Sequence, residues 1–240
     1  MAPYARLEEL LIILLGGLCT AAVAWFFGWW SLIPAIVTLA LLSFYRDPPR
    51  RVPDVPTAIL APADGKVVDI SHDVALQDGS SVLRIVIFLS VFNVHVNRSP
   101  CAGRVTDVQY RPGKFLNALK AEADAANECN TLVIEPQPPF PGPVRVRQIA
   151  GVLARRIVCA TRPGDSLTAG QRYGMIKLGS RTEICLPDNP GWELCVELGA
   201  RVRAGRSILA RLRPTETGVA AATSGPKSLQ TGAEAEPEAE

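Results

Sequence analysis

Three residues in the sequence, Asp64, His95 and Ser180, are of the types that nucleophilic catalysis uses. A serine hydroxyl becomes an effective nucleophile when an imidazole takes its proton and a carboxylate orients the imidazole and stabilises its charged form. Ser180 follows Gly179, and a glycine–serine pair alone marks an ordinary turn more often than a catalyst. Other features of the chain must therefore decide whether these residues act together.

His95 lies shortly after an apolar, β-branched run at residues 82–89 that predicts a core strand. By burial habits alone, a histidine there is more often a hydrogen-bonded core residue than a catalyst. Asn93, His95 and Asn97 alternate with valines, so an extended strand would place the three polar side chains on one face. Three polar side chains on one face favour a functional role for this histidine.

The composition is that of one ordinary domain with additional segments. The chain has 240 residues, of which 48% are hydrophobic, so a sizeable core can form. The net charge of +2, without a basic stripe, argues against a nucleic-acid partner. Six cysteines without a Cys-x-x-Cys pair argue against a structural zinc site and fit reduced thiols in a cytosolic domain. A Cys185–Cys195 disulfide stays compatible with the sequence.

Residues 1–46 predict a membrane-anchoring hairpin of two helices. No charge occurs in residues 10–45, and a single helix of that length would reach roughly 54 Å, against a hydrocarbon core of roughly 30 Å. The sequence Gly28-Trp29-Trp30-Ser31 divides this run into two apolar halves. The second half is short for a full span, so a re-entrant or interfacial hairpin stays open.

The charges around this apolar run predict its orientation in the cell membrane. Arginines flank the run on both sides, which places both ends, and the catalytic domain with them, on the cytoplasmic side. They are Arg6 before the run and Arg46, Arg50 and Arg51 after it. A signal peptide is the alternative, but the run is too long and no clear small-residue cleavage site follows it.

The remaining chain predicts a mainly β domain at residues 58–213, after a proline-rich linker at 47–57. Asp64-Gly65 predicts a tight turn between two strands. Further β-branched runs of strand length indicate an antiparallel all-β pattern; they lie at residues 82–89, 103–110, 131–135, 144–150 and 155–160. Residues 117–127 predict a short helix or loop, and residues 214–240 a disordered acidic tail.

Two segments, residues 164–170 and 199–205, both fit the pattern Gly-x-x-apolar-x-x-Gly. Glycines at this spacing suit a tight loop whose central apolar residue enters a core, and the duplication indicates pseudo-symmetric halves. The pattern resembles the turn of biotinyl and lipoyl carrier domains, which implies a flattened β-sandwich or barrel. Two unrelated glycine-bounded turns are the alternative.

Four motifs, in order along the chain, resemble the short, bacterial and archaeal branch of the phosphatidylserine decarboxylase family. The resemblance runs from the apolar hairpin to about Leu212 and rests on several independent motifs. They are FLSVFNVHVNRSP at 88–100, YRPGKF at 110–115, NECN at 127–130 and GQRYGMIKLGSR at 170–181.

The resemblance implies a proenzyme that cleaves itself between Gly179 and Ser180 and turns the serine into an N-terminal pyruvoyl group, a covalent cofactor. His95 would act as the base and Asp64 would orient it. The hydroxyl of Ser180 would then attack the carbonyl of Gly179, and the ester formed would eliminate to dehydroalanine, which hydrolyses to pyruvoyl and ammonia. Glycine tolerates the strained backbone that this attack requires.

The implied reaction converts phosphatidylserine to phosphatidylethanolamine through a Schiff base on the pyruvoyl group from Ser180, which takes up electrons as carbon dioxide leaves. No pyridoxal phosphate and no metal are expected. His95 is the expected proton donor to the α-carbon. The implied partners are phosphatidylserine, the membrane, and the large and small chains made by self-cleavage, while a homo-oligomer is left open.

The chain departs from the longer members of the family at two places. Those members carry Gly-Ser-Thr, whereas Arg181 follows Ser180 here, as in the short branch, and its relation to the lipid phosphate is left open. They also have a second histidine just before the catalytic one, where this chain has Phe92 and Asn93. No substrate role of that histidine can be carried over.

Two alternative functions stay open at this point. The same chemistry could act on archaetidylserine, because its headgroup is identical. A non-enzymatic carrier domain, with His95 phosphorylated or a lysine acylated, would fit the glycine repeats and the turn at residues 61–65. That account gives no role to the apolar hairpin or to Gly179-Ser180.

Overall fold

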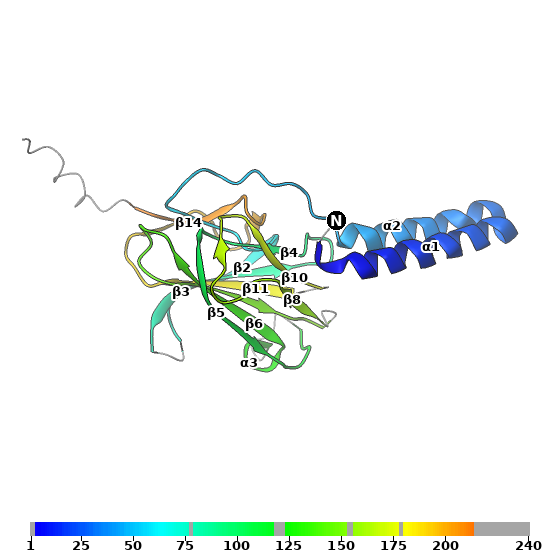
Figure 1. Cartoon of the computed structure of the whole chain (residues 1–240). Coiled ribbons are helices and arrows are strands. Elements are labelled where there is room, and N and C mark those ends of the chain that lie inside the picture. Colours follow the sequence, from blue (N-terminus) through cyan, green and yellow to red (C-terminus); the bar gives the residue numbers. More distant parts are fainter. Residues whose placement is uncertain (1–2, 77–78, 118–122, 153–155, 178–179, 214–240) are drawn as a thin grey trace, which may run out of the picture.

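The structure is a computed structural model that describes residues 3–76, 79–117, 123–152, 156–177 and 180–213 (Figure 1). It consists of an N-terminal pair of helices and a β domain, joined by an extended linker (Figure 1). The expected fold class, a mainly antiparallel β domain after a helical hairpin, is confirmed. The expected tail at residues 214–240 lies outside the described residues.

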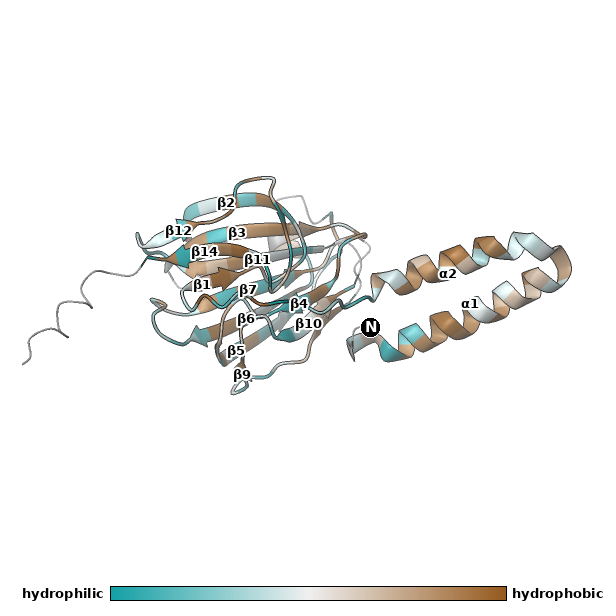
Figure 2. Cartoon of the chain, turned by 90° about the horizontal axis from the view of Figure 1, so that it is seen from above, coloured by the Kyte–Doolittle hydropathy of each residue, from teal (hydrophilic) through white to brown (hydrophobic). Residues whose placement is uncertain are grey.

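The hairpin consists of α1 (Arg6–Phe27) and α2 (Leu32–Phe44), joined by the short 3-10 helix η2 (Gly28–Ser31) and preceded by η1 (Pro3–Ala5). The break at the two tryptophans is where the sequence predicts it. The helices lie side by side and project from one end of the β domain, and hydrophobic residues occur along most of their length (Figures 1 and 2). An 18-residue stretch within Arg6–Phe44 has a mean hydropathy of 2.4 and none of its residues is buried, which fits a lipid environment.

A close approach holds the two helices together at Gly16. A Cβ atom there would lie 2.3 Å from the hydroxyl oxygen of Thr38 on the other helix, so only glycine fits. Small residues at such contacts are typical of helices that pack within a bilayer.

The β domain contains one large antiparallel sheet in the order β13-β2-β3-β11-β7-β6-β5-β9. The strands are β2 (Gly65–Ala75), β3 (Ser81–Leu89), β5 (Gly103–Arg111), β6 (Cys129–Pro136), β7 (Val144–Ile149), β9 (Ser166–Leu167), β11 (Ser180–Pro187) and β13 (Arg201–Val202). A short helix, α3 (Ala123–Ala126), precedes β6. The central position of β11, between β3 and β7, places Ser180 inside the sheet rather than at an edge.

Two three-stranded sheets complete the domain. The first has the order β1-β14-β12, and the second has the order β4-β10-β8. Their strands are β1 (Ala58–Leu60), β14 (Ile208–Leu212), β12 (Trp192–Leu194), β4 (Val96–Arg98), β10 (Arg172–Ile176) and β8 (Ile157–Cys159). The second sheet lies at the end from which the hairpin projects, whereas β14 lies toward the opposite end (Figure 1).

The two glycine-bounded segments form the two edges of the large sheet. Residues 164–170 contain the edge strand β9 and residues 199–205 the edge strand β13. All four bounding glycines have positive φ, and the central residues Leu167 and Val202 are buried in the main core. The segments also touch, because a Cβ on Gly205 would lie 3.2 Å from the Cα of Gly170. The pseudo-symmetric interpretation is therefore favoured over two unrelated turns.

Two strands flank Asp64-Gly65 as the sequence predicts, but they do not pair with each other and Gly65 does not have the positive φ that such a dipeptide favours. β1 pairs with β14 and β2 pairs with β3 and β13, so the strands on the two sides of Asp64 belong to different sheets. Gly65 is the first residue of β2, and a Cβ there would lie 2.2 Å from the carbonyl oxygen of Phe88. The glycine is required by the close approach of two strands, not by positive φ.

This contact predicts that Gly65→Ala lowers the free energy of unfolding by about 1–3 kcal/mol, because the backbone must move to admit the methyl group. Gly142→Ala is the matched control, since its Cβ would make an ordinary contact at 3.4 Å with Pro187, and we expect a change within about 0.5 kcal/mol. Chemical denaturation of the full chain in neutral detergent measures both. Equal effects of the two substitutions would contradict this account of Gly65.

Candidate active site

Ser180 is fully buried at the first position of β11. Its neighbour across the ladder is Leu89, the last residue of β3. Its Oγ atom is shielded from solvent and has no hydrogen-bond partner within the described part of the chain. A buried hydroxyl without a partner is costly to keep, which favours a chemical role for it. Gly179, the expected partner in cleavage, lies outside the described residues.

A chain of buried side-chain hydrogen bonds ties β4 to the large sheet beside Ser180. The Nδ2 atom of Asn97 donates to the hydroxyl of Thr182 at 3.3 Å, and the Nε2 atom of Gln148 donates to Oδ1 of Asn97 at 2.9 Å. Asn130 extends the chain by donating to Oε1 of Gln148 at 3.0 Å. Because amide networks of this kind are directional, they fix the position of β4 over β11.

This contact also relates His95 to Ser180. Alternate residues of an extended segment share a face, so His95 lies on the side of Asn97 and Ser180 on the side of Thr182. The hydrogen bond from the amide of Ile176 to the carbonyl of His95, at 3.2 Å, continues the β4–β10 ladder to His95. This alternation puts both candidate residues on the faces of β4 and β11 that meet through Asn97 and Thr182.

The imidazole of His95 is held as a neutral base. Its Nδ1 atom lies 2.9 Å from the carbonyl oxygen of Asn93, and because a carbonyl only accepts, the proton is on Nδ1. Nε2 therefore carries the lone pair, and it is buried without a hydrogen-bond partner among the described residues. Burial lowers the pKa of His95 to about 4, with a smaller contribution from Arg46. At neutral pH, Nε2 is available to take a proton.

Asp64 is buried, but the structure does not place it on His95. Its Oδ2 atom pairs with Nη2 of Arg50 at 2.8 Å, and its Oδ1 atom accepts from the amide of Ala204 at 2.8 Å. The carbonyl of Asn93 takes the orienting position that the family resemblance implies for Asp64. Asp64 instead joins the linker to the second glycine-bounded segment, and a catalytic role for it stays a prediction.

Arg181 points away from the interior that Ser180 faces, because successive strand residues alternate. Its Nη2 atom lies 2.9 Å from Oε1 of Glu183, which also pairs with Arg147 at 2.6 Å. Glu183 is fully buried between these two guanidinium groups. This ion-pair network lies on the opposite face of β11 from Ser180 and stabilises the start of the strand.

Asn93 does not share a strand face with His95 and Asn97, so this prediction is wrong. It lies in a turn, where its Oδ1 atom accepts from the amide of Ser90 at 2.9 Å and from its hydroxyl at 2.8 Å. Serine and asparagine three residues apart are a usual turn signal, which the alternation with valines obscured. Phe92, in the same turn, is 83% exposed.

Several residues around the site could not be identified from the sequence. The ring of Phe44, at the end of α2, lies 4.1 Å from the ring of His95 between centroids. Gln148 and Thr182 contact Asn97 through pairings between distant strands. No local pattern marks these contacts, because each joins segments far apart in the sequence.

The site fits a group made from Ser180 itself. The hydroxyl is buried and has no partner among the described residues, so Ser180 could be modified without losing a hydrogen bond seen there. In the described part of the chain, no group of three metal-binding side chains occurs. The arrangement suits a serine that acts on its own backbone, with His95 as base.

Comparison with known proteins shows the family of this chain. The family model described as phosphatidylserine decarboxylase matches residues 37–210. The phosphatidylserine decarboxylase proenzyme of Rhodopirellula baltica is 45% identical over 216 residues, covering 87% of this chain and 88% of the relative. Those of Solibacter usitatus and Nitrosomonas eutropha are 46% and 43% identical, covering 81% and 82% of this chain and 91% of each relative. The chain therefore belongs to the phosphatidylserine decarboxylase family.

Proposed function

We propose that this protein decarboxylates phosphatidylserine to phosphatidylethanolamine and is made as a proenzyme that cleaves itself at Gly179-Ser180. The family and the proenzyme names of its relatives support the reaction. The observation that supports the residue assignment is the buried hydroxyl of Ser180, which has no hydrogen-bond partner among the described residues. The enzyme is a carboxy-lyase whose pyruvoyl group comes from Ser180.

Self-cleavage begins at the hydroxyl of Ser180. Nε2 of His95 takes the hydroxyl proton, and Oγ forms a bond to the carbonyl carbon of Gly179. The peptide C–N bond then breaks, and the amine of Ser180 receives a proton, which leaves an ester. Loss of the α-proton expels the Gly179 carboxylate and gives dehydroalanine, and water converts this to the pyruvoyl group and ammonia.

In the decarboxylation, a pyruvoyl group derived from Ser180 would supply a ketone able to accept the electrons of the bond to the carboxylate. His95 would return a proton to the α-carbon of the substrate. Burial lowers the pKa of His95, so a proton on Nε2 is held weakly and is transferred readily. The surrounding apolar residues and Phe44 exclude water from this step.

The contacts at the base of the hairpin support a location of the site near a membrane surface. The ammonium of Lys177, three residues before Ser180, pairs with Glu8 of α1. The guanidinium of Arg46, just after α2, donates to the carbonyl of Phe92, three residues before His95. Both catalytic segments are therefore attached to the hairpin. If the hairpin is held in the cell membrane with the β domain on the cytoplasmic side, the site lies close to the lipid headgroups.

The substrate assignment is tested with carboxyl-labelled phosphatidylserine in mixed micelles. We expect the purified full chain to release labelled carbon dioxide and to form phosphatidylethanolamine. Ether-linked archaetidylserine, assayed in parallel, separates the two lipid classes, since a preference for it would transfer the assignment to that lipid. Release from neither lipid by fully cleaved protein would contradict the proposed reaction.

A further inference from the structure

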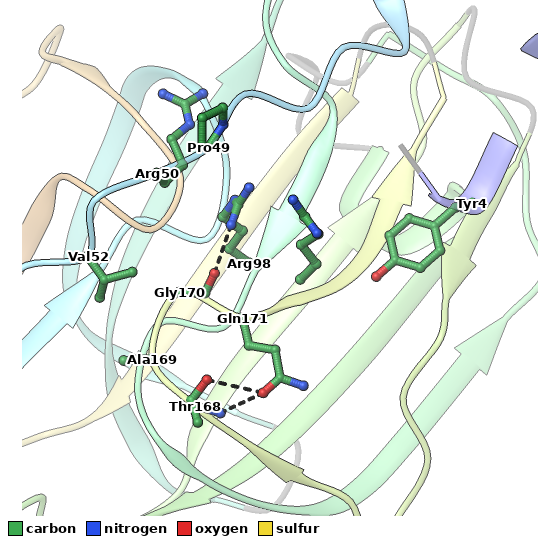
Figure 3. A pocket seen from close by; sticks show the side chains of 10 residues that line it. Tyr4, Pro49, Arg50, Val52, Arg98, Thr168, Ala169, Gly170 and Gln171 are labelled. Carbon is green, nitrogen blue, oxygen red and sulfur yellow. Dashed lines mark hydrogen bonds between the residues drawn. The ribbon is translucent and has the colours of Figure 1, made fainter. Parts of the chain in front are cut away.

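An open cleft of about 640 Å³ lies beside the start of α1. It lies between the N-terminus, the linker and the turn that leads into β10 (Figure 3). Its lining residues are Tyr4, Pro49, Arg50, Val52, Arg98, Thr168, Ala169, Gly170, Gln171 and Arg172. The catalytic account uses none of them, so the cleft calls for its own explanation.

The polar groups that the cleft offers are mainly hydrogen-bond donors. Oε1 of Gln171 accepts from the amide of Thr168 at 2.9 Å and from its hydroxyl at 3.2 Å, so the NH₂ group of Gln171 is left to donate (Figure 3). Arg172 uses Nε to pair with Asp47 at 2.5 Å, and its Nη1 and Nη2 atoms have no partner among the described residues. No carboxylate belongs to the described lining.

Tyr4 adds a further donor to the cleft. Burial raises the pKa of its hydroxyl above the usual value of 10.0. The charge of Asp47 also raises this pKa, whereas the charges of Arg172 and Arg98 lower it. The hydroxyl therefore keeps its proton at neutral pH and can donate.

The charge around the cleft is also positive. Three guanidinium groups line it, those of Arg50, Arg98 and Arg172. Two buried carboxylates lie behind them, because Asp47 pairs with both Arg98 and Arg172 and Asp64 pairs with Arg50. One positive charge is in excess, and the exposed guanidinium of Arg172 carries it at the surface. Donors and positive charge without a facing carboxylate suit an anion.

The cleft is separate from the catalytic interior. Asn97 and Arg98 are neighbours on β4, so their side chains point to opposite sides of the strand. Asn97 contacts Thr182 of the large sheet, whereas Arg98 contacts Asp47 and the carbonyl of Gly170 on the side of the linker. An anion in the cleft would therefore lie across β4 from Ser180.

We propose that this cleft binds the phosphate group of a headgroup or of free phosphate, at a site distinct from the catalytic one. The planar guanidinium of Arg172 matches two phosphate oxygens, while Gln171 and Tyr4 contribute single hydrogen bonds. For a lipid source the inference rests on the proposed membrane anchoring, because the hairpin base that supplies Tyr4 would lie at the bilayer surface. The bound phosphate need not belong to a lipid that reacts.

The test measures binding to the full chain in neutral detergent, with Ser180→Ala as the background so that no pyruvoyl group contributes. The probes are inorganic phosphate and dihexanoyl phosphatidylglycerol, whose headgroup lacks an amine, and dihexanoylglycerol is the control without phosphate. Titration calorimetry gives each affinity, and the melting temperature without ligand reports folding. Binding is thus measured independently of decarboxylation.

Gln171→Glu is the most specific variant. Its carboxylate can still accept the two hydrogen bonds from Thr168, but it replaces the NH₂ donor of Gln171 by a negative charge. We expect it to weaken phosphatidylglycerol binding at least about tenfold, and Arg172→Gln to do the same. Tyr4→Phe should weaken binding about threefold. Arg211→Gln removes an exposed arginine from β14, toward the far end of the domain, and should change nothing.

The outcomes separate the two sources of phosphate. Tighter binding of phosphatidylglycerol than of inorganic phosphate identifies a lipid headgroup site, and equal binding identifies a site for free phosphate. The proposal is overturned if neither phosphate probe binds, if dihexanoylglycerol binds as well as phosphatidylglycerol, or if the cleft variants that keep the parent melting temperature bind like Arg211→Gln.

Discussion

Ser180→Ala is expected to leave the chain uncut and to release no carbon dioxide from phosphatidylserine. The substitution removes the only atom that can attack the preceding carbonyl, so the acyl shift cannot begin and no pyruvoyl group forms. Both losses should reach at least about 10⁴-fold, because one residue supplies the nucleophile and the later electron sink. Denaturing electrophoresis measures cleavage, and trapping of labelled carbon dioxide measures decarboxylation.

The matched control is Ser99→Ala. Ser99 is also a fully buried serine, but its hydroxyl donates to the carbonyl of Cys101 at 2.7 Å and has no place in the reaction. We expect Ser99→Ala to cost about 1 kcal/mol of stability and to leave cleavage complete. Cleavage of Ser180→Ala at the same bond would show that another residue is the nucleophile.

His95→Ala is expected to slow self-cleavage by about 10²–10⁴-fold, the usual contribution of a general base. The imidazole is the group that takes the proton from Ser180, since its Nε2 atom is unprotonated and directed into the interior. Cleavage is followed by electrophoresis during cell-free synthesis, which captures the uncut chain. His72→Ala is the control, because His72 is exposed on β2.

Asp64→Asn tests whether the carboxylate of Asp64 has a structural role or orients His95 during self-cleavage. In the structure, Asp64 contacts Arg50 and the amide of Ala204. If Asp64 acts only through these contacts, the asparagine of Asp64→Asn keeps one acceptor oxygen, and the rate of self-cleavage should fall much less than in His95→Ala. If Asp64 orients the histidine during the reaction, the two variants should slow cleavage by similar factors. The structure favours the first result.

The lowered pKa of His95 fixes the sign of the pH dependence. Since the pKa in the folded chain is about 4, the imidazole is a free base from pH 8 down to about 5, and the cleavage rate constant should stay level there and fall near pH 4. The usual histidine pKa of 6.5 applies to the unfolded chain. Between these values the unfolded chain binds the proton and the folded chain does not, so stability decreases as the pH falls. A rate that halves near pH 6.5 would contradict a buried His95.

Much of the architecture could be predicted because local patterns determine it. The break at Gly28-Trp29-Trp30-Ser31 falls where the two helices turn, and the short β-branched runs became strands. The sequence displays the two glycine-bounded segments because their ends have positive φ, which favours glycine. Their central residues, Leu167 and Val202, lie in the core, which favours apolar side chains. These features depend on a few neighbouring residues, which the sequence displays directly.

The contacts around the site could not be predicted, because they join distant segments. The resemblance implies that Asp64 orients His95, but Asp64 pairs with Arg50 of the linker, and nothing in the local sequence shows this. Gly65 was interpreted as a turn residue because Asp-Gly is a common turn signal, yet its role comes from Phe88 on a neighbouring strand. Arg181 follows the nucleophile but faces the opposite side of the sheet, where Glu183 pairs with it.

The most direct test of the central claim is the intact mass of the chains in purified wild-type protein. The account predicts two chains, the smaller one beginning at residue 180 and lighter than its serine form by the mass of one ammonia, with a ketone that reacts with hydrazides. A single uncut chain with Ser180 unmodified would contradict the account. So would a small chain that begins at residue 180 with a free amine.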